Sequence, residues 1–320
     1  MIYIAKISKE CILAISLIQI SLLQSSGQIV VVKFVNIALI YADGYQQLSD
    51  EKRYKLYCLL QHFNHTTPMI TEVLNYVHPH GAPAKGKILM VASSPAISKQ
   101  TGWHIGFWAA ELTHPLRIFQ EAGYDIDIVS TEGGKLQMDG YSNPTDPSGY
   151  SAHDIISLGY LQKPEFLAML ENTKKLTEVS HKDYAAIFLV GGQAPMYTFR
   201  GNKDLEELFV SFFEAGKPAA AVCHSTTLLL EAKTSKGELL VRGKTWTGFA
   251  DAEEDFADQA VGQKIQPYRI EEEARKLHGT TFKVAAPFSA FAIQDGNLIT
   301  GQQQNSGAAA AELVVKALQP

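Results

Sequence analysis

Cys223 and His224 stand where a run of small, apolar residues gives way to a polar, helix-forming segment. Residues 218–222 predict a buried strand, and Ser225 and Thr226 offer hydroxyl groups suited to capping a helix behind it. A cysteine at such a strand-to-helix turn is the thiol version of a nucleophile elbow, which lifts the reactive side chain out of the sheet. The partial positive charge of the helix N-terminus favours the thiolate there. We therefore predict that Cys223 is a nucleophile; the alternative is a buried structural cysteine.

A nucleophilic thiol needs a base and usually a third group that orients the base. His224 follows Cys223 directly, and a tight elbow can aim both side chains at one site. Glu111 is a further candidate because it lies in an otherwise apolar helical segment beside Phe107 and Trp108. Apolar surroundings resist ionisation of a carboxyl group, so a neutral Glu111 could donate a hydrogen bond to a thiolate. The alternative is a surface glutamate on an amphipathic helix.

Apolar strand segments and helical segments alternate regularly from residue 87 onward. This order predicts an α/β fold with a doubly wound, mostly parallel sheet and helices on both faces, as in flavodoxin. The expected strands cover 88–92, 124–129, 184–190, 218–222, 246–249, 282–286 and 297–300. The expected helices cover 107–122, 164–177, 205–215 and 307–318, and the polar stretch 139–162 is expected to cross the surface. Active residues of such a fold lie at the carboxyl ends of strands, where Cys223 and the pair Gly191-Gly192 both fall.

Four motifs, in this order, resemble the ThiJ/PfpI superfamily, which has the class I glutamine amidotransferase-like fold. They are Glu111-Leu-Thr-His114-Pro115, the Cys223-His224 elbow, Thr247-Gly-Phe-Ala-Asp-Ala-Glu-Glu254 and Asp295-Gly-Asn-Leu-Ile-Thr-Gly301. The pattern is most similar to the branch that holds the glutathione-independent glyoxalases (glyoxalase III) and related stress chaperones. The resemblance covers about residues 87–320. It implies a homodimer whose reaction requires no metal and no organic cofactor.

The resemblance also implies roles for the motif residues. Cys223 resembles the nucleophile, His224 the adjacent base and Glu111 the acid that hydrogen-bonds the thiol. Glu254 is similar in place to the carboxylate that orients the histidine, with Glu253 as the candidate if the register slips by one. The alternative for both glutamates is that they are solvated loop charges.

The Gly191-Gly192 pair would supply backbone N–H donors near the reacting oxygen, together with the amide of His224. The alternative is a simple tight turn after a strand. Two neighbouring positions depart from the glyoxalase branch, which usually has Gly-His-Gly after this strand and a glycine after the Cys-His pair. Gln193, assigned here to the oxyanion and substrate-binding region, can donate a hydrogen bond but cannot shuttle a proton at neutral pH. Ser225 would either narrow the pocket or cap the helix.

These residues lead to one principal function and two alternatives. The principal function is a cysteine-dependent enzyme that acts on small dicarbonyls and converts methylglyoxal to a hydroxy acid, with a small molecule as its substrate. An amidase or glutamine amidotransferase-like hydrolase is one alternative, although the adjacent His224 differs from the standard glutaminase triad, whose histidine lies far downstream. The other is a stress chaperone or redox sensor whose cysteine is oxidised.

The composition excludes several partners and cofactors. The net charge is −5 and no Lys/Arg-rich run occurs, so we expect no nucleic acid partner. The three cysteines are too few and too scattered for a disulfide framework or a paired-cysteine zinc site. A reducing, cytoplasmic location is the simplest expectation.

Residues 1–86 are predicted to be an N-terminal extension of unknown role that precedes the catalytic domain, residues 87–320. Its apolar stretch 11–23 is short for a membrane span but suits the core of a signal peptide, so export is the alternative to the cytoplasm and no membrane partner is expected. Four histidines in this extension have spacings that can bind metals but lack a carboxylate or cysteine companion. They are His62, His65, His78 and His80. We therefore expect no metal site.

Overall fold

The computed structural model describes residues 85–319. By its internal contacts the chain divides into Met1–Ala82 and Pro83–Pro320, and the description below concerns the second unit. The four histidines and the apolar stretch 11–23 lie outside the described residues. No helix in the described part has both the length and the apolar character needed to cross a membrane. Over the same residues no group of three or more His, Cys, Asp or Glu side chains could hold a metal ion.

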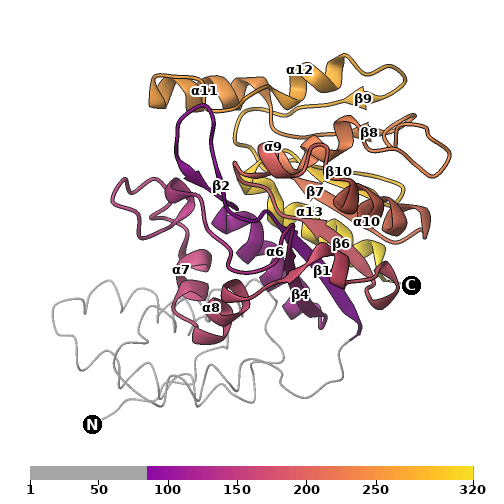
Figure 1. Cartoon of the computed structure of the whole chain (residues 1–320), viewed down its shortest axis with the longest axis horizontal. Coiled ribbons are helices and arrows are strands. Elements are labelled where there is room, and N and C mark those ends of the chain that lie inside the picture. The colour runs from indigo at the N-terminus through magenta and orange to yellow at the C-terminus, as the bar shows by residue number, and fades with distance from the viewer. Residues whose placement is uncertain (1–84, 320) are drawn as a thin grey trace, which may run out of the picture. The chain divides into compact units, whose positions relative to one another are not determined.

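A seven-stranded sheet runs through the middle of this unit in the order β10-β11-β7-β6-β1-β4-β5 (Figure 1). The strands are β1 Lys87–Ala92, β4 Asp125–Ser130, β5 Lys174–Lys175, β6 Ala186–Leu189, β7 Ala219–Val222, β10 Ala292–Asp295 and β11 Leu298–Gly301. Every neighbouring pair is parallel except β10 and β11. The central strands β6, β7 and β11 are buried throughout, which explains their continuous apolar runs, since helices cover a parallel sheet on both faces. The predicted α/β fold is confirmed.

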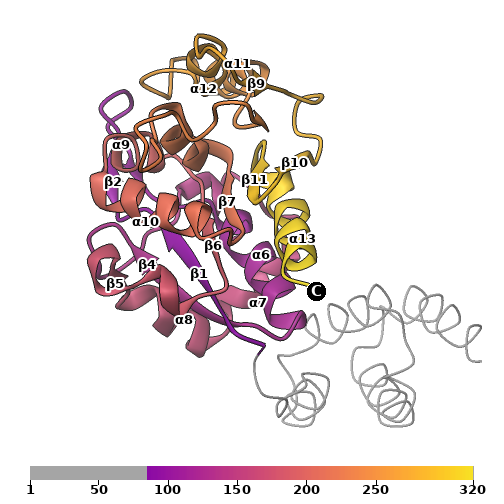
Figure 2. The ribbon, with the colours of Figure 1, turned by 90° about the vertical axis from the view of Figure 1, so that its right-hand side faces the viewer.

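Helices cover the two faces of the sheet (Figure 2). The helix α6, Ala109–Glu121, and the helix α13, Gly307–Ala317, pack against each other on one face, and α10, Lys203–Glu214, covers the other. The expected stop of the first helix is present, because Gly123 directly after it has a left-handed φ of +87°.

In the middle of the chain one expected helix is too long, and the stretch expected to cross the surface contains two short helices. The stretch 139–162 contains a 3-10 helix, η1 Gly140–Ser142, and an α-helix, α7 Ile155–Leu161, which is capped by the Asp154 side chain. The helix expected over 164–177 ends early, as α8 Pro164–Glu171. Lys174 and Lys175 instead pair with β4 at the sheet edge as β5, and the Thr173 hydroxyl bonds with the Ser130 hydroxyl, 2.7 Å away.

The last third of the chain adds helices beyond the carboxyl ends of the strands, where α11 Asp251–Val261 and α12 Ile270–Arg275 lie together (Figures 1 and 2). The expected strands at 246–249 and 282–286 are shorter and stand apart from the main sheet as a parallel pair, β8 Thr245–Trp246 and β9 Thr281–Phe282. Another small sheet pairs β2 Ala96–Ile97 with β3 His104–Ile105. The remaining short helices are α9 Pro195–Thr198, η2 Leu176–Glu178, η3 His181–Asp183, η4 Cys223–Leu230 and η5 Gln304–Ser306.

Candidate active site

Cys223 directly follows β7 and has a backbone φ of +58°. A residue with a β-carbon rarely adopts this left-handed conformation, which costs about 1–3 kcal/mol and persists only where the surroundings enforce it. The cysteine is 2% exposed. The helix behind it is the 3-10 helix η4. The predicted elbow is therefore present, with its strain at the cysteine itself.

Ser225 caps this helix, which is one of its two predicted roles. Its hydroxyl oxygen accepts the N–H of Val222 at 2.9 Å. Ser225 is the third residue of the helix, and Val222 is the residue directly before the helix. The same hydroxyl lies 2.6 Å from the Val222 carbonyl and 3.0 Å from the Leu189 carbonyl, either of which can accept its proton. Ser225 thus joins β7 to β6 beneath the elbow.

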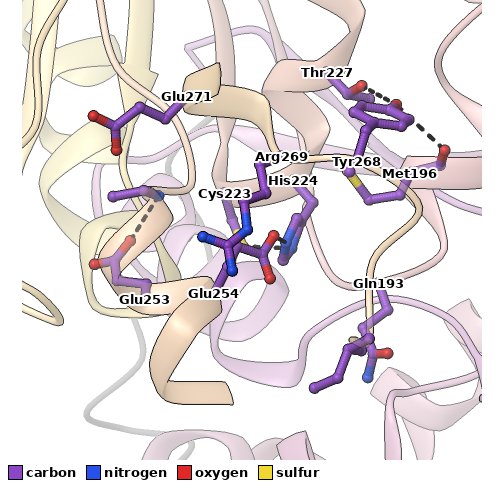
Figure 3. A network of polar contacts seen from close by, with 12 residues as sticks. Gln193, Met196, Cys223, His224, Thr227, Glu253, Glu254, Tyr268, Arg269 and Glu271 are labelled. Atoms are coloured by element: carbon purple, nitrogen blue, oxygen red, sulfur yellow. Dashed lines mark hydrogen bonds and ion pairs between the residues drawn. The ribbon is translucent and has the colours of Figure 1, made fainter. Parts of the chain in front are cut away.

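His224 lies between the thiol and a carboxylate (Figure 3). Its Nδ1 is 3.4 Å from the Cys223 sulfur, and its Nε2 is 2.9 Å from Oε1 of Glu254. The imidazole also stacks on the Phe249 ring, with centroids 4.1 Å apart. If Nε2 carries the proton and donates it to Glu254, Nδ1 presents a free lone pair to the thiol. The two consecutive side chains do converge, as the elbow predicts.

The neighbouring glutamates Glu253 and Glu254 lie in the first turn of α11 and are both buried, so neither is a solvated loop charge. Glu254 faces the imidazole. Glu253 instead accepts the N–H groups of Ala250 at 3.0 Å and Phe288 at 2.9 Å, and the side-chain amide of Gln302 at 2.8 Å. The geometry favours Glu254 as the orienting carboxylate. Glu253 instead stabilises the loop around residue 288 through its hydrogen bonds.

Glu111 is fully buried in α6, which excludes the surface alternative. Burial raises the pKa of its carboxyl group to about 8, and the negative charges of Asp139 and Glu253 add to this rise. No hydrogen bond of good geometry reaches either oxygen, although the Cys223 thiol and the Gly191 N–H lie close enough to offset part of the rise. At neutral pH Glu111 therefore keeps its proton beside the thiol.

The expectation that the elbow favours the thiolate is wrong for the resting protein. Burial raises the pKa of the Cys223 thiol well above its ordinary value. The backbone N–H groups of His224 and Gly192 act in the opposite direction but are outweighed. Desolvation of a buried sulfur is the larger effect, so the thiol must lose its proton during the reaction.

The turn after β6 has no room for side chains. A β-carbon on Gly191 would lie 2.2 Å from Oε2 of Glu111 and 2.7 Å from the β-carbon of Cys223. A β-carbon on Gly192, whose φ is +117°, would lie 2.5 Å from the backbone nitrogen of Trp108. The bare backbone lets the Gly192 N–H approach the sulfur, beside the N–H of His224, while the Gly191 N–H faces Glu111.

Residues 105–317 match the model of the DJ-1/PfpI family. The chain belongs to the DJ-1/PfpI family. A probable glutathione-independent glyoxalase of Schizosaccharomyces pombe is 30% identical over an alignment of 261 residues that covers 74% of this chain and 100% of that protein. Glyoxalase 3 of Candida albicans is 28% identical over 220 residues, 68% of this chain and 92% of that protein. The crystal structure of glyoxalase III from Candida albicans superimposes with a TM-score of 0.63 at 26% identity, covering 74% of this chain and 99% of that one.

Gln193 is where this DJ-1/PfpI chain differs from the expected family pattern. Its backbone N–H donates to Oδ2 of Asp139 at 2.7 Å, and its side-chain oxygen is buried without a partner. Figure 3 shows the side chain apart from the Cys223-His224 pair. Its part in substrate binding stays a prediction.

Asp139 is the residue near this site that sequence reasoning missed. Its carboxylate accepts the backbone N–H groups of Gly106 at 2.9 Å and Gln193 at 2.7 Å, and burial raises its pKa to about 6. An aspartate followed by Gly140 at the start of a polar stretch is also a common turn pair. The sequence therefore carries no signal that separates this buried carboxylate from an ordinary turn.

Proposed function

We propose that the protein converts methylglyoxal to lactate without glutathione, with Cys223 as the nucleophile. The observation that carries this is the array of Cys223, His224 and Glu254, with a sulfur-to-Nδ1 distance of 3.4 Å and an Nε2-to-carboxylate distance of 2.9 Å. Relatives named glutathione-independent glyoxalases match most of the chain and support a small dicarbonyl as substrate.

The first step is addition of the thiol to the aldehyde carbon. His224 Nδ1 takes the proton of Cys223 while the sulfur forms a bond to that carbon. The proton then goes to the former aldehyde oxygen, which gives a hemithioacetal. Glu254 holds the opposite ring nitrogen and stabilises the imidazolium while it exists.

The second step moves a proton between the two carbons. His224 removes the proton on the carbon attached to sulfur and delivers it to the neighbouring carbonyl oxygen, which gives an enediol. The hydroxyl on the sulfur-bearing carbon then gives its proton to His224, and His224 returns a proton to the neighbouring carbon. The product is a lactoyl thioester on Cys223. Water hydrolyses it to lactate and restores the thiol, so methylglyoxal plus water gives lactate with no net oxidation.

The buried surroundings assist these steps. The N–H groups of Gly192 and His224 face the sulfur and stabilise negative charge that develops there. Glu111, which keeps its proton up to about pH 8, can donate a hydrogen bond as the thiolate forms. General acid–base help of this kind contributes about 10²–10⁴-fold to a rate.

The test is lactate formation from methylglyoxal in the absence of glutathione, comparing wild type with Cys223→Ser. We expect turnover by wild type and none above background by the variant, with both proteins folded by circular dichroism. Equal turnover by the variant would contradict the mechanism. Absence of turnover by folded wild type would contradict the function, and ammonia release from glutamine would then be measured.

The redox-sensor alternative fits the geometry less well. Sensor cysteines are exposed and have a low pKa, whereas Cys223 is almost completely buried and its pKa is raised. The adjacency of His224 remains the argument against an amidotransferase.

We also propose that the protein is a cytoplasmic homodimer. The dimer rests on the family resemblance, and the location rests on the few, scattered cysteines. Light scattering should give twice the chain mass of 35.1 kDa, and cell fractionation should place the protein with cytoplasmic markers. A mass of one chain, or recovery with exported proteins, would contradict the respective proposal.

A further inference from the structure

Three loops are bonded together beside the candidate active site. They are the loop before α6 at residues 106–108, the loop at 137–139 and the loop after β6 at 191–194. Their backbones exchange hydrogen bonds in both directions. The bonds run from Phe107 to Gln137 at 3.0 Å, from Asp139 to Phe107 at 2.9 Å, from Trp108 to Gly191 at 3.1 Å and from Ala194 to Gly106 at 3.1 Å.

The Asp139 side chain lies at this junction and is fully buried. One carboxylate oxygen accepts the N–H of Gly106 and the other accepts the N–H of Gln193, so each oxygen holds a different loop. The first loop leads into α6, which carries Glu111. The loop after β6, to which Gln193 belongs, also contains Gly192, whose N–H lowers the pKa of the Cys223 thiol. The carboxylate therefore connects the backbones that position two parts of the site.

The junction has no free space to absorb a displacement. A β-carbon on Gly106 would lie only 1.7 Å from the carbonyl oxygen of Gln137. Closely packed backbone transmits a shift instead of damping it. A change at Asp139 should therefore reach Gly192.

Asp139 also acts on the site through its charge. Its negative charge raises the pKa of Glu111, as does that of Glu253, while the Cys223 thiol lowers it. His224 lowers the pKa of Asp139 itself, which burial brings to about 6. Between about pH 6 and pH 8 Asp139 is thus ionised while Glu111 is protonated.

We propose that Asp139 is a positioning residue: its carboxylate fixes the loops that carry Gly106 and Gln193 and, through them, the Gly191-Gly192 turn beside Cys223. The turnover part of its test rests on the proposed function, but the second readout does not.

The first readout is the kinetics of Asp139→Asn on methylglyoxal. The amide nitrogen of asparagine cannot accept a hydrogen bond, so one of the two loops loses its acceptor. Misplacing a backbone donor should lower kcat by about 10- to 100-fold, with KM changed by only a few-fold. Ser142→Ala is the matched control, because the buried Ser142 hydroxyl donates to the Asp139 carbonyl in the same turn at 2.7 Å. It should lower stability and leave kcat unchanged.

The second readout is an infrared titration of the protonated Glu111 carboxyl, recognised as the band that Glu111→Gln removes. The wild-type midpoint should lie at about pH 8. In Asp139→Asn it should lie lower because a neighbouring negative charge is gone, whereas Ser142→Ala should keep the wild-type midpoint. A merely structural role would reduce stability without moving the midpoint.

A wild-type kcat together with an unmoved midpoint in Asp139→Asn would overturn the proposal. If the protein does not turn over methylglyoxal at all, the proposed function fails and the infrared midpoint still decides the role of Asp139. If Asp139→Asn does not fold, Asp139→Glu replaces it. That variant keeps the charge but displaces both oxygens, so kcat should fall while the midpoint stays; an undiminished kcat would overturn the proposal.

Discussion

The turns that follow the neighbouring strands β6 and β7 serve the same sulfur in opposite ways. After β7, Cys223 keeps its side chain in a backbone conformation that disfavours one, with φ at +58°. After β6, Gly191 and Gly192 have no side chains, and a β-carbon at either would collide with the surroundings. One turn supplies a reactive group and the other supplies N–H donors and space. A position that must lack a side chain can therefore constrain the site as strictly as a position that must carry a reactive one.

The largest effect should come from the carboxylate that serves the elbow. Glu254→Gln removes the charge that orients and stabilises His224, so kcat/KM should fall by about 10²–10⁴-fold with little loss of stability. Glu253→Gln is the matched control one residue away. It disturbs a carboxylate that accepts three hydrogen bonds, so stability should fall by about 1–3 kcal/mol while kcat stays within a few-fold.

Steady-state kinetics and thermal unfolding of both variants check this contrast. The reverse result, with Glu253→Gln inactive and Glu254→Gln active, would contradict the prediction and show that Glu253 orients His224.

The next effect should come from filling the other turn. Gly191→Ala places a methyl group against Glu111 and Cys223, so the turn must move; we expect a loss of kcat of about 10²-fold and of stability of about 1–3 kcal/mol. Gly159→Ala is the control, because no atom lies within 4 Å of its would-be β-carbon and alanine favours its helix. Its activity should be unchanged and its melting temperature equal or higher. Full activity of Gly191→Ala would show that the turn does not need its space.

A smaller effect, on stability, should follow from the pKa of Glu111, which is raised from 4.5 to about 8 in the folded protein. Between these pH values the unfolded chain releases the proton and the folded protein keeps it. The stability that this group contributes is therefore complete below about pH 4.5 and declines until about pH 8. Urea unfolding from pH 4.5 to 9 should show a flatter dependence for Glu111→Gln than for wild type. Parallel curves would mean that the carboxyl is ionised in the folded protein.

The smallest effect should come from Ser225→Ala, which removes the hydroxyl that joins the two strands beneath the elbow. The Val222 N–H loses its acceptor, and the free energy of unfolding should fall by about 1–2 kcal/mol. Because the hydroxyl points away from the sulfur chemistry, kcat should change by no more than a few-fold. A large loss of activity at unchanged stability would indicate that Ser225 shapes the pocket instead.

The sequence predicted which residues form the turn after β7, but it did not predict their burial or the pKa of the thiol. Cys223 and His224 are recognisable because thiol and imidazole are the groups such chemistry uses and local spacing indicates the elbow, whereas Glu254 was indicated only by the family resemblance. The raised pKa of Cys223 was missed, since it depends on burial by segments distant in sequence. Asp139 was missed because it acts on backbone N–H groups, which every residue except proline has.

The fold shows the same division between local and distant causes. The apolar strands and the helix α6, which ends before Gly123, follow from local pattern. The helix α8 ends early, and Lys174 and Lys175 pair instead with Val129 and Ser130 of β4, which is a contact between distant segments that no local pattern encodes. The small β8–β9 sheet likewise depends on pairing between segments far apart in the chain.

The nucleophile and its base are consecutive residues, which has a consequence for how the site withstands change. Their 3.4 Å separation depends on the torsions of one elbow, which the packed surroundings hold in a strained conformation. Glu254 reaches the imidazole only because α11 docks on the rest of the fold. The sequence neighbours Cys223 and His224 thus bring the reactive atoms together locally, whereas the orientation of the imidazole depends on a helix that only the assembled fold brings near.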